Sequence, residues 1–336
     1  MKRNVVSLGK IAHKLKREGK IREAEEIYIQ MLYIDSNSVY ALVGLGDLKR
    51  GVRRFEEASD YYKRCLEIEK NNWYALAGLG DTYRGLRDLD KALEAWYYCL
   101  KLRPDDHRTM TRVADGLRKK GELDNSKKYY FMALEKYPFD PYALMGLGQI
   151  AMKEGDDDEA LDFFEKLIEI SEKPVVALTS AANIFRKRKA FQKAMVLYER
   201  ALKFDPENSY AWHGKADCLR GMKKYRSAID AWEIALENGM DQRAGLTRIG
   251  DSYISLNELD LAEASYRKVI TAIGYDKYAY LGISKVHARK DALDKALEIL
   301  LMLRQRESED QRISEESRRF LERYPEIEKS TPICTD

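Results

Sequence analysis

The sequence repeats itself at a fixed interval of 34 residues. A small side chain keeps the same register nine times without insertion or deletion, at Ala24, Ala58, Ala92, Ser126, Ala160, Ala194, Ala228, Ala262 and Ala296. A constant period over so many intervals indicates stacked structural units that bury their apolar faces against one another. We therefore expect one array of nine units in place of a closed globule.

Further columns in the same register predict helices. All positions are counted from the small residue of the 34-residue register. A second small residue lies twelve positions before it, as at Gly46 and Gly80, and a large ring lies four positions after it, as at Tyr62 and Trp96. Aliphatic residues recur sixteen positions before it and eight positions after it. Within each half of a unit these offsets differ by four or eight, which is the spacing of one helix face, whereas strands alternate every second residue. Each unit is therefore predicted to hold two helices.

Polar residues and prolines predict where these helices begin and end. Asn and Asp side chains accept the free backbone N–H groups of a first turn, and proline stops a helix. First helices are expected to begin near Asn72, Asp106, Asp140 and Asn208. Second helices are expected to begin near Asp90, Asp124, Asp158, Asp260 and Asp294, and three of them to end before Pro104, Pro138 and Pro206.

With its small, leucine, glycine, aromatic, alanine and proline columns in this order, the chain resembles the tetratricopeptide repeat family over roughly Val5 to Asp310. The resemblance implies an all-α, right-handed superhelical α-solenoid of nine helix-turn-helix repeats whose first helices line a concave groove. It also implies that the protein binds other proteins and is not an enzyme.

The period sets the domain boundaries. The array is predicted to cover 5–310 in the units 5–38, 39–72, 73–106, 107–140, 141–174, 175–208, 209–242, 243–276 and 277–310. A C-terminal capping helix is predicted at 311–324, because Ser308 and Gln311 have the spacing of a capping box and apolar residues then recur on one face. Residues 325–336 are expected to be a flexible tail. The first unit, with no cap before it, is expected to expose Leu15, Ile21 and Ile27.

Composition excludes several classes of function. Lys plus Arg exceed Asp plus Glu by only three, which gives no general reason to expect nucleic acid or an acidic membrane as partner. No secretory signal or membrane span is visible, so we expect a cytoplasmic protein. The four cysteines form no close pair, and Cys65 and Cys99 share a core column, so no metal or cofactor is expected.

No catalytic constellation is visible in the sequence. The four histidines fall in different columns of distant units, and no phosphate loop, nucleophile elbow or HExxH motif is present. A protein without enzymatic activity is predicted.

Two polar columns of the first helices are candidates for ligand binding. In seven of the nine units an acidic or amide residue stands eleven positions before the register position, and in four of them an Asp is followed three residues later by an Arg on the same face. These pairs are either a solvated ion-pair stripe or a ladder that takes backbone and side-chain groups of a bound peptide. A tyrosine column seven residues earlier either packs on the preceding unit or anchors a partner.

The groove candidates are Tyr40, Asp47, Tyr74, Asp81, Arg84, Arg108, Arg112, Asp115, Arg118, Tyr142, Asn183, Tyr210, Asp217 and Asp251. Arg108 and Arg112 resemble the arginine part of the clamp with which some family members hold a chaperone's terminal carboxylate. Asp47 and Asp81 stand where that clamp wants asparagine, and Val43 where it wants lysine, so we reject that specific function.

Three functions remain in competition. The leading one is a scaffold or adaptor that binds a peptide or helical segment of a partner protein in the concave groove. The second is a structural subunit that self-associates into a homo-oligomer or multiprotein assembly through its uncapped first unit. The third is nucleic-acid binding through Arg50, Arg84, Arg118, Arg186 and Arg220, which is disfavoured because the aspartates neutralise that stripe.

Overall fold

The computed structural model describes residues 2–330, with side chains for 7–327, and every regular element in this part of the chain is a helix. The first helices of the nine repeats are α1 (Lys2–Arg17), α3 (Val39–Gly51), α5 (Trp73–Gly85), α7 (His107–Lys120), α9 (Pro141–Glu154), α11 (Val175–Lys187), α13 (Ser209–Gly221), α15 (Gln242–Ser255) and α17 (Lys277–Arg289). The second helices are α2 (Ile21–Ile34), α4 (Phe55–Ile68), α6 (Leu89–Leu102), α8 (Leu123–Lys136), α10 (Asp157–Ile170), α12 (Phe191–Phe204), α14 (Tyr225–Glu237), α16 (Leu259–Ile273) and α18 (Leu293–Arg306).

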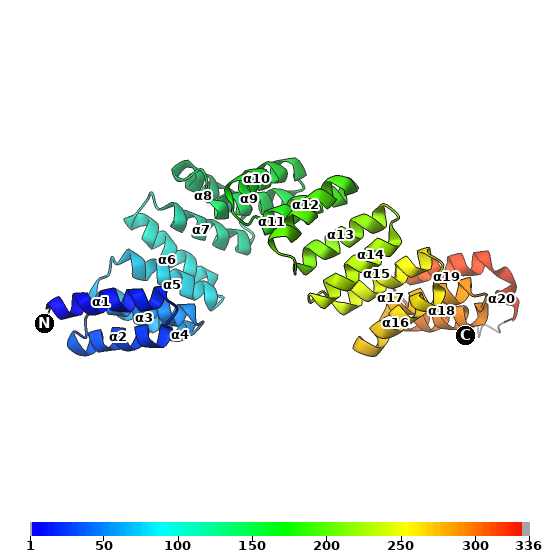
Figure 1. Ribbon diagram of the computed structural model, residues 1–336, viewed down its shortest axis with the longest axis horizontal. Helices are drawn as coiled ribbons and strands as arrows, with labels where there is room; N and C mark the ends of the chain where they lie inside the picture. The colour runs from blue at the N-terminus through cyan, green and yellow to red at the C-terminus, as the bar shows by residue number, and fades with distance from the viewer. Residues whose placement is uncertain (1, 331–336) are drawn as a thin grey trace. The chain divides into compact units, whose positions relative to one another are not determined.

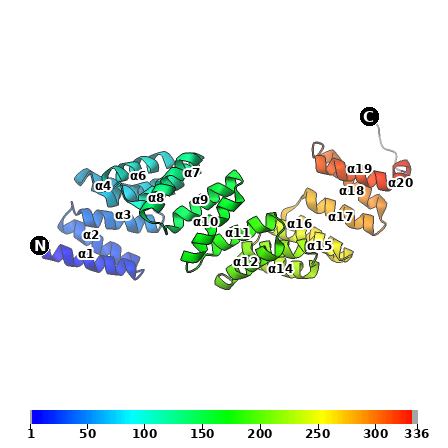
Figure 2. The ribbon, with the colours of Figure 1, turned by 90° about the horizontal axis from the view of Figure 1, so that it is seen from above.

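The chain forms two compact units, Met1–Ser171 with α1 to α10 and Glu172–Asp336 with the later helices. Within each unit, the two helices of a repeat pack side by side, and the second helix also packs on the first helix of the next repeat (Figure 1). A turned view shows the same antiparallel pairs (Figure 2). The predicted all-α solenoid of nine helix pairs is confirmed. None of the described helices is long and apolar enough to cross a membrane.

A ring inserted between two helix backbones holds neighbouring repeats together. The ring of Tyr62, on α4, is fully buried between Gly46 of α3 and Gly78 of α5. A Cβ atom added to these glycines would lie 2.7 and 2.4 Å from ring carbons, so only glycine lets the backbones approach this closely. The ring column and the glycine columns of the sequence are therefore two sides of one contact.

Most of the expected helix caps are present, with a shift in the second helices. Asn72, Asp140 and Asn208 accept backbone N–H groups as predicted, but the Asp106 carboxylate accepts the Thr109 hydroxyl instead. Five second helices begin one residue before the expected aspartates, which are therefore the second helical residues: Asp90, Asp124, Asp158, Asp260 and Asp294. A carboxylate there still stabilises the first turn through the helix dipole.

The C-terminal end differs from the prediction in two details. The capping helix α19 (Gln311–Arg323) buries Ile313 and Phe320 against the ninth repeat, but its N-cap is Asp310 and not the box of Ser308 and Gln311. A short helix α20 (Pro325–Ser330) replaces the first part of the predicted tail, because Ile327 is buried in the same cluster. Residues 331–336 lie outside the described residues.

The three apolar residues of the first repeat that were expected to be exposed are only partly so. Leu15, Ile21 and Ile27 are partly buried and pack against the core formed by residues such as Ala24 and Tyr28.

We predict that Gly146→Ala destabilises the array. The new Cβ would lie 2.1 Å from the buried ring of Tyr130, so the ring or the helices must move, at a cost of about 1–3 kcal/mol. Urea unfolding followed by circular dichroism measures the change. Gly51→Ala is the matched control, because no atom lies within 4 Å of its added Cβ and alanine favours a helix. Equal stability changes in the two variants would contradict the packing role of the ring.

Candidate peptide-binding groove

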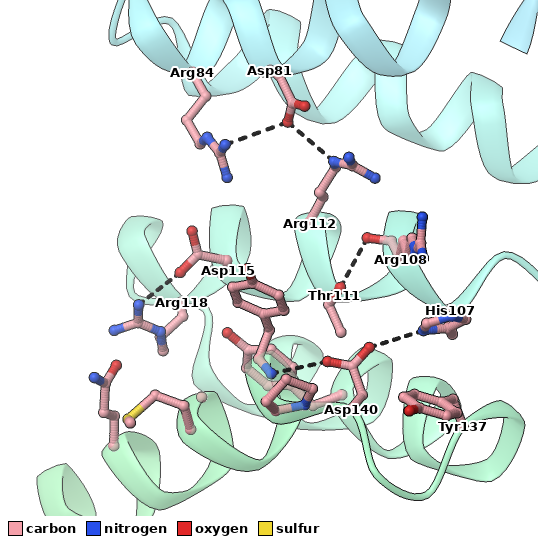
Figure 3. Close-up of a pocket in the computed structure, with 16 residues that line it drawn as sticks. Asp81, Arg84, His107, Arg108, Thr111, Arg112, Asp115, Arg118, Tyr137 and Asp140 are labelled. Atoms are coloured by element: carbon pink, nitrogen blue, oxygen red, sulfur yellow. Dashed lines mark hydrogen bonds and ion pairs between the residues drawn. The ribbon is translucent and has the colours of Figure 1, made fainter. Parts of the chain in front are cut away.

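Two neighbouring cavities open along the first helices of the N-terminal unit. One, of about 760 Å³, is lined by α5, α7, α9 and the loop before α9 (Figure 3). The other, of about 800 Å³, is lined by α3, α5, α7 and the loop before α7. Asp81, Arg108 and Arg112 line both cavities, so they lie on the wall that the cavities share. The first helices thus form a polar groove in this unit.

Asp81 is the centre of an arginine cluster on this wall. Its carboxylate accepts a hydrogen bond from Arg112 Nε at 3.1 Å and lies 3.4 Å from the Arg84 guanidinium, as Figure 3 shows. The Arg50 guanidinium, from α3, lies 3.6 Å away. We call Asp81 with these three arginines the first arginine cluster. Because its partners come from α3, α5 and α7, the cluster links three consecutive repeats.

A second arginine cluster, four repeat periods later, has the same composition. Asp217 on α13 accepts hydrogen bonds from Arg186 at 2.7 Å and Arg248 at 2.8 Å, and Arg220 lies 3.5 Å away. Burial lowers the pKa of the neighbouring His213, and the arginines lower it further against the opposing effect of Asp217. Each cluster therefore sets three guanidinium groups against one carboxylate.

Three other predicted groove residues are explained by the core. Asp47, Asn183 and Asp251 each accept a hydrogen bond of 2.7 Å from the buried tyrosine of their own repeat, and these donors are Tyr62, Tyr198 and Tyr266. Burial is the largest effect on the tyrosines and raises the pKa of all three, to about 12 for Tyr198. Burial opposes ionisation of Asp47, but hydrogen bonds from Lys16 and Tyr62 outweigh it and lower the pKa of Asp47.

The remaining charged candidates differ in how fully they are paired. Asp115 binds Arg118 at 2.7 Å and Lys119 at 3.1 Å, and these contacts lower its pKa against the effect of burial. Arg108 is exposed at the cavity mouth, and its guanidinium has no ion pair or hydrogen bond among the described side chains. The side chain of the neighbouring His107 is hydrogen-bonded to Asp140, with 2.8 Å between Nδ1 and Oδ2.

The five tyrosines of the column are exposed to different degrees. Tyr40 is 51% exposed, with its ring tilted against that of Tyr28, and Tyr278 is 37% exposed beside three cations. The other three side chains, which begin first helices in both units, remain 60, 77 and 82% exposed, at Tyr74, Tyr142 and Tyr210. Packing on the preceding repeat thus accounts for only part of this column.

Comparisons with known proteins identify the family of these repeats. Models described as tetratricopeptide repeat match residues 38–107, 113–173, 197–230 and 245–274, which together make up more than half of the chain. The chain belongs to the tetratricopeptide repeat family. No curated protein matches this sequence.

Solved structures agree with the fold of this tetratricopeptide repeat protein. The APC/C hetero-tetramer Cut9-Hcn1 aligns with a TM-score of 0.55 and 15% identity over 90% of this chain, which spans 60% of that chain. PilF of Pseudomonas aeruginosa aligns with a TM-score of 0.54 and 17% identity over 66% of this chain and 100% of that chain. At these identities the likeness concerns the fold.

The repeat columns, taken one at a time, do not reveal the arginine clusters. Arg248 belongs to none of the candidate columns, and Arg50, Arg186 and Arg220 stand out in the sequence only as parts of a stripe. The available signal was a spacing of 31 residues, which separates Asp81 from Arg112 and Asp217 from both Arg186 and Arg248. A spacing of 31 residues is the 34-residue period minus three residues. Two residues at this spacing therefore lie on the first helices of adjacent repeats.

We predict that the array loses stability as the pH rises from about 10 to about 12. The pKa of the buried tyrosines Tyr28, Tyr130 and Tyr198 is raised from 10.0 to about 12, chiefly by burial. Their contribution to folding is therefore complete below pH 10 and is lost as the pH approaches 12. Urea unfolding at a series of pH values measures the loss. Tyr198→Phe, which removes one titrating group, should show a smaller loss over this range; an equal loss would contradict the assignment.

Proposed function

We propose that this protein is a scaffold or adaptor that binds a segment of a partner protein along its first helices. The observation that carries this proposal is the exposure of Tyr74, Tyr142 and Tyr210 at the starts of first helices. Tyrosine offers a large apolar surface and a hydroxyl at little cost in side-chain entropy, and such residues dominate the binding energy of many interfaces. Tyr74 and Tyr142 each line one of the two cavities, so their rings border the space that a segment would occupy.

The polar groups in the cavities fit a polypeptide ligand. Arg84, Arg108 and Arg112 present guanidinium N–H groups, which bind carbonyl and carboxylate oxygens. The ligand is a segment of protein because family membership implies protein–protein interaction, and one similar structure is itself a hetero-tetramer of Cut9 and Hcn1.

The same family membership supports a protein without catalytic activity. The histidine nearest the groove, His107, is bound to Asp140, which caps α9. Within residues 2–330, no group of three His, Cys, Asp or Glu side chains could hold a metal ion.

Self-association through the first repeat receives no support from the three residues that suggested it. Leu15, Ile21 and Ile27 pack inward against the first core cluster and do not form a free apolar face.

We predict that Tyr74→Ala combined with Tyr142→Ala weakens capture of the partner from native lysate by tenfold or more. Each lost aromatic anchor costs roughly 1–2 kcal/mol, and the melting temperature should stay the same because both side chains are exposed. Capture is measured by quantitative pull-down and mass spectrometry. Tyr33→Ala is the matched control, since Tyr33 is 87% exposed on a second helix. Equal capture by the double variant and the wild type would overturn the proposal.

A further inference from the structure

The two arginine clusters are copies of one arrangement. Each member of the first cluster has its counterpart four repeat periods later: Asp81 with Asp217, Arg50 with Arg186, Arg84 with Arg220, and Arg112 with Arg248. Both occur in repeats whose buried ring is a tryptophan, at Trp96 and Trp232. One cluster lies in each compact unit.

The identity of the ring explains why the aspartate needs arginines here. A tyrosine ring brings a hydroxyl that donates to the aspartate of its own repeat, as Tyr62 does to Asp47. In the repeat whose buried ring is a phenylalanine there is no such hydroxyl, and the neutral Gln149 stands in place of the aspartate. The tryptophan repeats also lack the hydroxyl but keep a buried charge, so the chain must supply cations. One guanidinium would neutralise the charge, and three are present.

The geometry places the excess positive charge on the outside. The carboxylate side chains of Asp81 and Asp217 are 7% and 4% exposed, whereas the six guanidinium side chains are between 28% and 44% exposed. Asp47, which also contacts Arg50, is already paired with Lys16. Each buried aspartate therefore orients three partly exposed arginines, which together carry two positive charges more than are needed to neutralise it.

This arrangement has the chemistry of an anion receptor. We propose that each arginine cluster binds side-chain carboxylates of an acidic, Asp- and Glu-rich segment of the partner, so that the chain carries two equivalent sites. The proposal rests on the groove function above and names the ligand chemistry of that surface. Guanidinium groups bind carboxylates with paired, charge-assisted hydrogen bonds. The first cluster lies on the wall shared by two cavities. If a carboxylate of the segment binds this cluster, the residues before and after it in the segment can enter the two cavities.

Arg84 and Arg220 are the residues to test. Each lies on the same helix as its aspartate, at 3.4 and 3.5 Å from it, so neither ties one repeat to the next. They are also the most exposed arginines of their clusters, at 38% and 44%. Substitution by glutamine removes the charge, and the links between repeats made by Arg112, Arg186 and Arg248 remain.

The experiment is calorimetric titration of the full chain with a synthetic peptide of alternating Glu and Gly. The wild type should bind two peptides per chain, with affinity that falls as salt is added. R84Q and R220Q should each weaken one of the two sites by about tenfold, and the double variant both. R267Q is the matched control, because it removes an exposed arginine from a surface pair on a second helix. A Gln–Gly peptide should not bind.

Several outcomes would overturn the proposal. They are a single site in the wild type, equal binding of the Gln–Gly peptide, or R84Q and R220Q isotherms identical to that of the wild type. Binding of a phosphoserine–Gly peptide without binding of the Glu–Gly peptide would replace carboxylate by phosphate. The groove function can survive these failures: if R84Q with R220Q captures the partner normally while the double tyrosine variant does not, the groove binds a segment that is not acidic.

Discussion

The insertion of one buried ring between two helix backbones organises this protein. The ring of a second helix touches the first helix of its own repeat and the first helix of the next, as Tyr62 does between Gly46 and Gly78. Because a Cβ atom on either side would overlap the ring, the glycines fix how closely the helices approach. The contact repeats along each unit, for example where Tyr266 lies between Gly250 and Gly282, so it sets both the stacking and the position of the groove wall.

The same ring decides the polar chemistry of the groove. A tyrosine passes between the helices and delivers its hydroxyl to an acceptor such as Asp47 or Asn183 on the first helix. A tryptophan brings no phenol, and the aspartate of its repeat is held by three arginines instead. In these repeats the ring that packs the core and the charges that line the groove are therefore coupled.

Much of the fold could be predicted because its contacts are local and periodic. Helix pairs follow from spacings of three and four residues, and caps such as Asn72 and Asp140 act within three residues of their own position. The errors occurred where distant contacts intervene. Ile327 extends the helical region beyond Pro325 because it reaches the core of the ninth repeat, a contact that a local pattern does not reveal.

The sequence by itself determined the repeat, the helices, the family and the columns that face the core, because side-chain spacing along one helix is fixed by the helix itself. Only the tertiary structure decided which partners the side chains of the polar columns bind. The partner of Asp47 is 15 residues away on the paired helix, and the Arg112 partner of Asp81 is 31 residues away in the next repeat. These contacts depend on how closely the helices pack, and the buried rings and glycines determine that distance.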